Sequence, residues 1–297
     1  MWFCANSGRG RSAAYDNCQI PGDFLSSFMP ELAEVEYYRR QWEPGLQRKI
    51  LAVQLRAGKK IFRGTDVAAL RKTLRGATLL GSKAHGKQLL FRFSKGGWLG
   101  IHLGLTGKLR IEPAAAVALK HDHLVLRQSR HSLVLSDPRQ FGRVLFHRGK
   151  TQPAWWRNRP PAILSRHFTR TRMEQFLSRH GRAPVKAVLL LQSGFPGIGN
   201  WMADEILWQS KIHPGRPAGQ LQPGETRKLH AKIQSISRAA LRTVGENDGD
   251  LPKSWLFHHR WERGGHCPVD GSALRRGQCG GRTTCWCPGC QRREVCV

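Results

Sequence analysis

The hydrophobic pattern of the chain changes its period near residue 150, and this change restricts the possible folds more than any other feature. Before it, "LLFRF", "WLGIHLGL" and "GRVLFHR" predict β-strands, and the "SKGG" that joins the first two is a hairpin signal. After it, "PVKAVLLLQ", "GNWMADEILWQSK" and "ETRKLHAKIQSISRAALRTV" predict helices. Because strands and helices are segregated along the chain, we expect a multidomain α+β protein.

Three helices carry more detailed signals. Apolar residues from Pro30 to about Trp42 step by three or four, which predicts one helix ahead of the strands. Thr171 and Glu174 have the spacing of a capping box and predict where the helical half begins. The longest helical stretch presents one apolar face, formed by Leu229, Ile233, Ile236, Ala240 and Val244.

Composition marks the domain boundaries. Residues 151–165 are rich in Pro and Trp, and they predict a stiff linker between a β-rich domain at 29–150 and a helical domain at 166–256. Residues 257–297 are rich in Gly, Arg and Cys, and they have too few apolar residues to fold without a staple. Residues 1–28 have a net charge of 2 − 2 = 0 and no helical or strand period, so we expect a disordered leader upstream of a true start at Met29.

The charge of the chain indicates its partner. With 49 Lys and Arg against 20 Asp and Glu, the formal net charge is +29, which favours binding to DNA or RNA through counterion release. No apolar run is long enough to span a bilayer, and residues 1–28 lack the apolar centre of a signal peptide. We therefore expect a soluble cytoplasmic protein without a membrane partner. Its 8 Cys then indicate reduced thiols or metal ligands.

The cysteines of the last forty residues predict a metal site. A C-x2-C pair lies 16 residues after a C-x2-D pair, and tetrahedral Zn2+ needs four ligands that two tight turns bring together. We expect one structural Zn2+ ion, with the ligands Cys267, Asp270, Cys287 and Cys290. Since carboxylate is a weaker zinc ligand than thiolate, the fourth position stays open to Cys279, Cys285 or His266.

A second binding signal lies where "SGFPGIGNWMADEILW" turns into a helix. Gly199 and Asn200 open this helix, and free backbone N–H groups at a helix start can bind a phosphate-sized anion. Ordinary helix capping is the alternative for this stretch alone. The positive charge of the chain favours the anion site.

The stretch "MPELAEVE" suggests a nucleophile. Pro30 followed by acidic residues is ordinary helix grammar, but Met before Pro is normally trimmed, and a start at Met29 would leave Pro30 with a free secondary amine. Such an amine can attack an aldehyde-like carbon and form an iminium. The positive end of its own helix and a neighbouring Lys would lower its pKa, and Glu31 is placed to move protons.

These features, in this order, resemble the formamidopyrimidine-DNA glycosylase/endonuclease VIII family of base-excision repair enzymes. The resemblance runs from Met29 to about Gln291 and includes "MPELAEVE", "HGKQLLFRF", "IHLGLTGKLR", "KHDHLVL" and "DPRQFGRVLF". "PGIGNWMADEILWQSKIHP" looks like the helix–two-turn–helix element of the family, and "GGRTTCWCPGCQ" resembles its zinc-finger hairpin. The implied fold is an N-terminal helix plus β-sandwich domain, a helix–two-turn–helix domain and a C-terminal zinc-finger β-hairpin.

The resemblance implies a monomeric enzyme that removes oxidised purines from double-stranded DNA and cleaves abasic sites. The implied catalytic residues are Pro30 as the nucleophile, Glu31 for proton transfer, Glu34 to hold the site, and Lys87 to bind the backbone and assist proton movement. The implied DNA contacts are Leu105, His121, Arg139, Gln140, Phe141, Lys186, Asn200 and Arg282. "PEL" after the start favours 8-oxoguanine and FapyG over the oxidised pyrimidines of the endonuclease VIII branch.

The sequence departs from the family pattern at two of the three positions that fill the space of the flipped base. Leu105 stands where Met is usual, and Gln140 replaces an Arg, whereas Phe141 keeps the wedge. Gln is neutral and reproduces the forked contact of Arg only in part, so the resemblance leaves the preference for the base opposite the lesion open.

Two other function classes compete with the enzyme. One is a non-catalytic DNA-binding relative, in which Pro30 lies in an ordinary peptide bond behind a real leader. The other is a basic protein associated with ribosomes or RNA. The carboxylates at Glu31 and Glu34 favour the enzyme, since DNA binding alone has no need of acidic groups facing a phosphate backbone.

Overall fold

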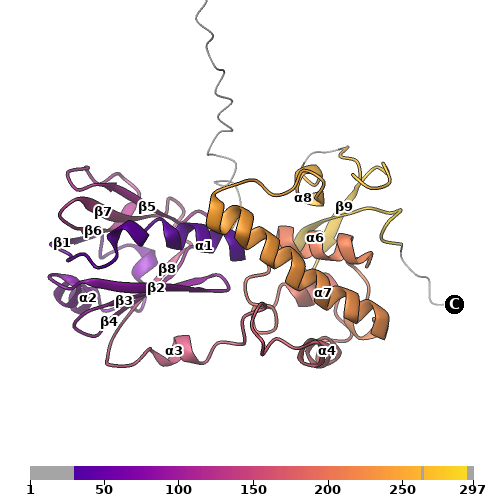
Figure 1. The fold of residues 1–297 in the computed structure, drawn as a ribbon, viewed down its shortest axis with the longest axis horizontal. Helices are drawn as coiled ribbons and strands as arrows, with labels where there is room; N and C mark the ends of the chain where they lie inside the picture. The colour runs from indigo at the N-terminus through magenta and orange to yellow at the C-terminus, as the bar shows by residue number, and fades with distance from the viewer. Residues whose placement is uncertain (1–29, 262–263, 293–297) are drawn as a thin grey trace, which may run out of the picture.

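The computed structural model describes residues 30–261 and 264–292, so the expected leader at 1–28 lies outside the described residues. The chain forms two lobes, a β-rich lobe that contains α1 and a helical lobe that carries the C-terminal hairpin (Figure 1). Among the described residues, no helix has both the length and the apolar character needed to cross a bilayer.

The β-rich lobe is a sandwich of two antiparallel four-stranded sheets, as expected. One sheet has the order β1-β6-β7-β5, with β1 at Ala52–Leu55, β5 at Lys108–Pro113, β6 at Asp122–Arg127 and β7 at His131–Ser136. The other has the order β2-β3-β4-β8, with β2 at Leu79–His85, β3 at Gln88–Phe93, β4 at Gly97–His102 and β8 at Arg143–Arg148. The two inner faces bury one apolar core, which includes Trp42, Phe91, Leu126 and Leu135.

Local sequence explains the connections of this lobe. The predicted "SKGG" hairpin joins β3 to β4, and its central residues Lys95 and Gly96 both have positive φ, as a type I′ turn requires. The helix α2 at Val67–Leu74 packs on β1, β4 and β8, and 3-10 turns lie at Glu43–Gly45 and Lys60–Phe62.

The first helix, α1 at Leu32–Arg40, matches the predicted stretch and connects the two lobes. Val35 and Tyr38 enter the sandwich core, whereas Ala33 belongs to the core of the helical lobe. The Glu31 side chain caps the helix and the Glu34 side chain binds the Glu31 backbone, which forms a reciprocal capping box.

The expected linker at residues 151–165 packs against the β-rich lobe. It contains α3 at Ala154–Arg157, whose Trp156 is buried with Leu90 and Trp98 on the outer face of the second sheet. The Arg159 guanidinium lies 3.7 Å from the centroid of the Trp156 ring. The prediction of a connector outside any core is therefore wrong for this tryptophan, because it finds an apolar surface on the neighbouring strands.

The helical lobe is built around α6 at Asn200–Ser210, which is buried along nearly its whole length. Around it lie α4 at Arg170–Arg179, α5 at Val185–Leu189, a 3-10 turn at Ala218–Gln220, α7 at Pro223–Ala240 and α8 at Leu256–His259. A π-helical segment, η5 at Leu241–Glu246, continues α7. The predicted apolar face of α7 and η5 is buried in this core.

The predicted capping box at Thr171 is wrong. Thr169 caps α4 instead, because its hydroxyl accepts the Arg172 N–H. Glu174 instead pairs with Arg170 at 3.4 Å and accepts the Thr226 hydroxyl of α7 at 2.7 Å.

The C-terminal segment forms a two-stranded hairpin of β9 at Arg275–Cys279 and β10 at Arg282–Trp286. Gly280 and Gly281 both have positive φ in its turn. The hairpin packs on α6, so its turn reaches toward the junction of the two lobes.

Candidate active site and metal centre

The start of α6 binds an anion, and that anion is the carboxylate of Glu31. Glu31 Oε2 accepts the backbone N–H groups of Gly199 at 2.9 Å and Met202 at 3.2 Å, and Oε1 accepts that of Trp201 at 3.0 Å. The predicted anion site therefore exists, but the side chain of Glu31, directly before α1, occupies it. The N-terminal dipole of α6 adds to these bonds and holds a buried carboxylate at the junction of the lobes.

Gly199 makes this approach possible. A Cβ at position 199 would overlap the carboxyl group of Glu31. The glycine therefore serves close packing here, since its φ of −124° is open to any residue.

Glu34 forms a second buried carboxylate beside the first. Its Oε1 accepts the indole N–H of Trp201 at 3.0 Å, and its Oε2 accepts the backbone N–H of Glu31 at 3.1 Å. Burial and the neighbouring Glu31 raise the pKa of Glu34 to about 7. Burial also raises the pKa of Glu31, against the opposing effect of Lys87.

Lys87 reaches the same place from the turn between β2 and β3. Burial lowers the pKa of Lys87, while the nearby Glu31 and Glu34 act to raise it. The turn rests against the loop before α6, because a Cβ on Gly86 would lie 3.0 Å from the Gly197 backbone nitrogen. Contact between the lobes thus sets the position of this ammonium relative to the two carboxylates.

These groups border a cavity of about 370 Å³ between the lobes. Five of the residues expected at the active site line it, namely Glu31, Lys87, Leu105, Asn200 and Arg282. Pro30 is buried directly before Glu31 and is not one of the lining residues.

Two loops joined by hydrogen bonds, here called the double loop, carry the remaining residues expected to probe DNA in the β-rich lobe. Asp137 is fully buried and ties the two loops together, since it accepts the Thr106 hydroxyl at 2.7 Å and the Gly142 N–H at 2.8 Å. Its own N–H donates to the carbonyl of the half-buried His121. The loop of Leu105 is thereby fixed beside the loop that carries residues 139–141.

At the tip of this double loop, Phe141 is 48% exposed, and the Arg139 guanidinium lies 4.8 Å from its ring centroid. Gln140 has a φ of 54°, and its Oε1 accepts the Lys60 backbone N–H at 3.2 Å. The expected wedge, Phe141, therefore projects from the surface, and the Gln140 side chain is hydrogen-bonded to the backbone at Lys60.

Lys186 occupies a different environment from the one expected. Its side chain is 0% exposed, and its Nζ pairs with Asp204 Oδ1 at 2.7 Å. It also donates to the Thr283 carbonyl at 2.9 Å and the Thr284 hydroxyl at 2.8 Å. The ammonium is enclosed and anchors β10 to the helical lobe, and the phosphate contact of Lys186 stays a prediction.

The four expected metal ligands come together. The ligand atoms of Cys267, Asp270, Cys287 and Cys290 all lie within 4.8 Å of one another. Cys267 Sγ is 3.8 Å from Cys290 Sγ, and Cys287 Sγ is 3.3 Å from both Asp270 oxygens. Tetrahedral Zn2+ with Zn–S of about 2.3 Å and Zn–O of about 2.0 Å places sulfurs ~3.8 Å apart and sulfur and oxygen ~3.5 Å apart. The donor set and its spacing fit zinc.

The alternative cysteines lie elsewhere. Cys285 is buried against α6, where its backbone N–H donates to Asp204 at 3.0 Å, and Cys279 Sγ lies 3.5 Å from the Pro214 carbonyl oxygen. Asp270 rather than either cysteine therefore completes the cluster.

Sequence reasoning missed three residues of the site. Trp201 donates to Glu34, and its place at the start of an apolar helix gave no sign of this. His102 lies near Lys87, and burial and Lys87 lower its pKa. Asp204 accepts from Lys186 and Arg260 and so links α5, α6 and the segment after α8. The one sequence signal for this role was an acidic residue within an apolar helix.

Comparison with known proteins assigns both lobes. Residues 29–144 match the family model of the formamidopyrimidine-DNA glycosylase N-terminal domain, and residues 160–248 match that of its H2TH domain. The formamidopyrimidine-DNA glycosylase of Alkalilimnicola ehrlichii is 33% identical, over 89% of this chain and 100% of the relative. That of Polynucleobacter necessarius is 34% identical with the same coverage.

Solved structures agree. The Lactococcus lactis Fpg bound to DNA with an oxidised pyrimidine has a TM-score of 0.80 and 28% identity, over 89% of this chain and 100% of that chain. A MutM complex with DNA that contains carbocyclic 8-oxo-G has the same TM-score, identity and coverage. L. lactis Fpg with abasic-site DNA has a TM-score of 0.79 and 27% identity, over the same shares of both chains.

Proposed function

The chain belongs to the formamidopyrimidine-DNA glycosylase family, and from this membership we propose that it excises oxidised purines from double-stranded DNA and then cleaves the abasic strand. The observation that carries the proposal is the pair of buried carboxylates, Glu31 and Glu34, gathered with Lys87 at the cavity between the lobes. Similar proteins bind DNA with oxidised bases and abasic sites, which supports this choice of substrate.

Pro30 is the proposed nucleophile. Its free amine attacks C1′ of the damaged nucleotide, the bond from C1′ to the base breaks, and an iminium forms between Pro30 and the opened sugar. Glu31 is the proposed proton carrier, since it lies next to the amine in sequence and its carboxylate is held by three backbone N–H groups. Glu34 keeps the Glu31 backbone in place, and Lys87 supplies a cation for the DNA backbone and assists proton movement.

The iminium activates the sugar for strand cleavage. Loss of a proton from C2′ expels the 3′ phosphate, and a second elimination expels the 5′ phosphate. The result is a one-nucleotide gap. Both steps need a proton acceptor at the sugar, and Glu31, whose carboxylate lines the cavity, is the proposed acceptor.

The proposed DNA contacts come from both lobes. Leu105, Arg139, Gln140 and Phe141 project from the double loop of the sandwich, while Asn200 and Arg282 line the cavity from the helical lobe. The proposed Zn2+ ion, held by Cys267, Asp270, Cys287 and Cys290, supplies structure to the segment that carries Arg282.

The amine exists only in a chain that begins at Pro30, so borohydride trapping tests the mechanism directly. We expect a covalent complex with an 8-oxoguanine duplex when the protein starts at Pro30. A form that keeps the preceding residues and a Pro30→Gly variant should both trap at least tenfold less. The intact mass of the native protein shows whether its chain begins at Pro30.

Two outcomes would change the proposal. Trapping on oxidised pyrimidines in preference to 8-oxoguanine would move the substrate to the other branch of the family. No trapped complex with any oxidised base, together with tight binding to abasic-site DNA, would establish a binding protein without catalysis.

A further inference from the structure

The helical lobe has a second hollow, of about 370 Å³, at the opposite end of α6 from the candidate active site. Trp208 and Lys211 line it at the C-terminal end of this helix, whereas Asn200 lines the active-site cavity at its start. The 11 residues of α6 separate the two places by roughly 16 Å of helical rise. An occupant of the second hollow would therefore leave the active-site cavity open.

The floor of this hollow is apolar. Trp208 and Trp255 border it with most of their surfaces buried, and Val269 beside them is 70% exposed. An apolar floor calls for a group that brings a hydrocarbon side chain.

The rim of the hollow is positive. Lys211 and Lys232 line it, and Lys228 lies close enough to both for their charges to lower its pKa, after the larger effect of its own burial. Within residues 30–261 and 264–292, no ion pair joins these three lysines to a carboxylate, and Lys232 instead donates to the Gln209 side chain at 3.2 Å. The rim therefore presents unneutralised charge next to apolar surface.

We propose that this hollow docks an acidic peptide segment of a partner protein, with a large apolar side chain on the tryptophan floor and neighbouring carboxylates at the lysines. Charge complementarity selects an acidic partner. The apolar floor favours a peptide over a nucleic acid, because a phosphate backbone has no hydrocarbon group to fill it.

Fluorescence anisotropy with three labelled peptides tests this proposal. The probe GSDDEELF carries both features, GSNNQQLF lacks the charge, and GSDDEEAA lacks the apolar anchor. With the full protein, we expect micromolar binding of the probe and at least tenfold weaker binding of each of the other two. If either control peptide bound as tightly as the probe, the proposed mode of recognition would be overturned.

Protein variants locate the site. Lys211→Glu combined with Lys232→Glu should weaken the probe at least tenfold and leave the affinity for abasic-analogue DNA within twofold. Arg227→Glu is the matched control, since it reverses a charge on α7 at a different hollow and should leave probe binding unchanged.

Three results would overturn the proposal. Equal probe binding by the double variant and the parent protein would place the peptide elsewhere. Full displacement of the probe by undamaged duplex DNA would assign the hollow to the DNA interface. A dimer in sedimentation that the double variant abolishes would make a second copy of this chain the occupant.

Discussion

At the scale of single residues, Gly199 decides whether Glu31 can reach the start of α6. A methyl group at this position would occupy the place of the Glu31 carboxyl, so Gly199→Ala should expel that side chain from its three N–H donors. We expect a loss of about 1–3 kcal/mol in the free energy of unfolding and at least tenfold slower borohydride trapping. Urea unfolding and single-turnover trapping measure the two effects.

Gly224→Ala is the matched control for that substitution. Gly224 lies in the first turn of α7, and no heavy atom lies within 4 Å of an added Cβ. This variant should keep full trapping and gain roughly 0.5–1 kcal/mol from helix propensity. Equal trapping by the two alanine variants would show that the position of Glu31 does not matter for the reaction.

Glu34 gives the fold a specific pH dependence. Burial and Glu31 raise its pKa to about 7 from the ordinary 4.5, so between these pH values the folded protein keeps a proton that the unfolded chain releases. Its contribution to stability is thus fully present below pH 4.5 and is lost as the pH rises through about 7. Relative to Glu34→Gln, the parent protein should lose about 1–3 kcal/mol over this range. Parallel stability curves from pH 4.5 to 8 would contradict this.

At the scale of elements, the C-terminal hairpin is held at two places. Lys186 and Asp204 bind the backbone of β10 from the helical lobe, and the proposed metal binds the turns on either side of the hairpin. Buried charges that are paired and hydrogen-bonded in this way stabilise one arrangement, since removal of either partner strands the other. Lys186 of α5 and Asp204 of α6 therefore set the position of Arg282, while the proposed metal joins the two turns that flank the hairpin.

Asp270 sets how tightly that metal is held. Asp270→Cys should complete a four-thiolate site and retain zinc against at least tenfold more chelator, whereas Asp270→Ala should release zinc more readily than the parent protein. Zinc release into a chromogenic chelator measures this order. Ser272→Ala serves as a control in the same turn. Identical zinc release by all four proteins would show that Asp270 is not a ligand.

Elements with local signals could be predicted from sequence, and contacts between distant segments could not. The helix after Pro30, the "SKGG" hairpin and the apolar face of α7 follow from spacing alone. The metal ligands follow from two pairs of equal spacing. The partner of Glu31 lies 168 residues away on α6, and the enclosure of Lys186 depends on a hairpin 97 residues further along, so neither leaves a local pattern.

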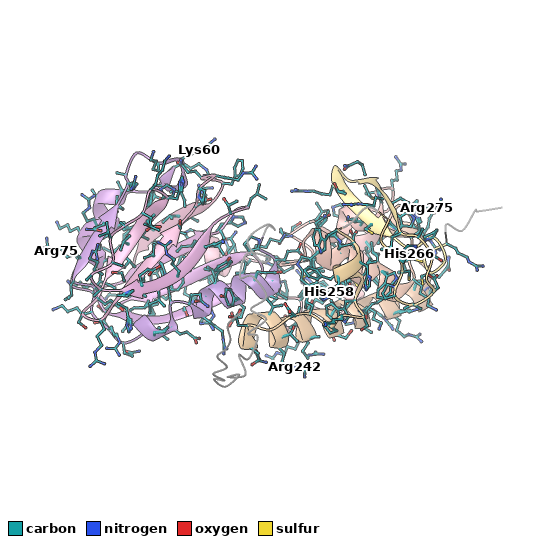
Figure 2. The ribbon with its side chains drawn as sticks, turned by 90° about the horizontal axis from the view of Figure 1, so that it is seen from above. Lys60, Arg75, Arg242, His258, His266 and Arg275 are labelled. Carbon is teal, nitrogen blue, oxygen red and sulfur yellow. The ribbon has the colours of Figure 1, made fainter. Side chains whose placement is uncertain are left out.

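At the scale of the whole molecule, basic side chains lie on both lobes. Figure 2 shows Lys60 and Arg75 on the sandwich and Arg242 and Arg275 on the helical lobe, on either side of the junction that holds the cavity. A net charge of +29 spread in this way attracts any duplex, whether damaged or not. Selectivity must then come from the few groups at the cavity and the double loop that are proposed to contact the lesion itself, such as Leu105 and Phe141.

This division of roles predicts how DNA affinity responds to salt. Between 50 and 200 mM salt, affinity for a duplex with an abasic analogue should fall by about a thousandfold or more, and affinity for undamaged duplex should fall by a similar factor, because counterion release dominates both. Their ratio should therefore change less than about tenfold. Anisotropy titrations over this range give both slopes. Arg282→Gln should make both slopes shallower by about one, as expected for one phosphate contact. A ratio that collapses with salt would instead assign selectivity to long-range charge.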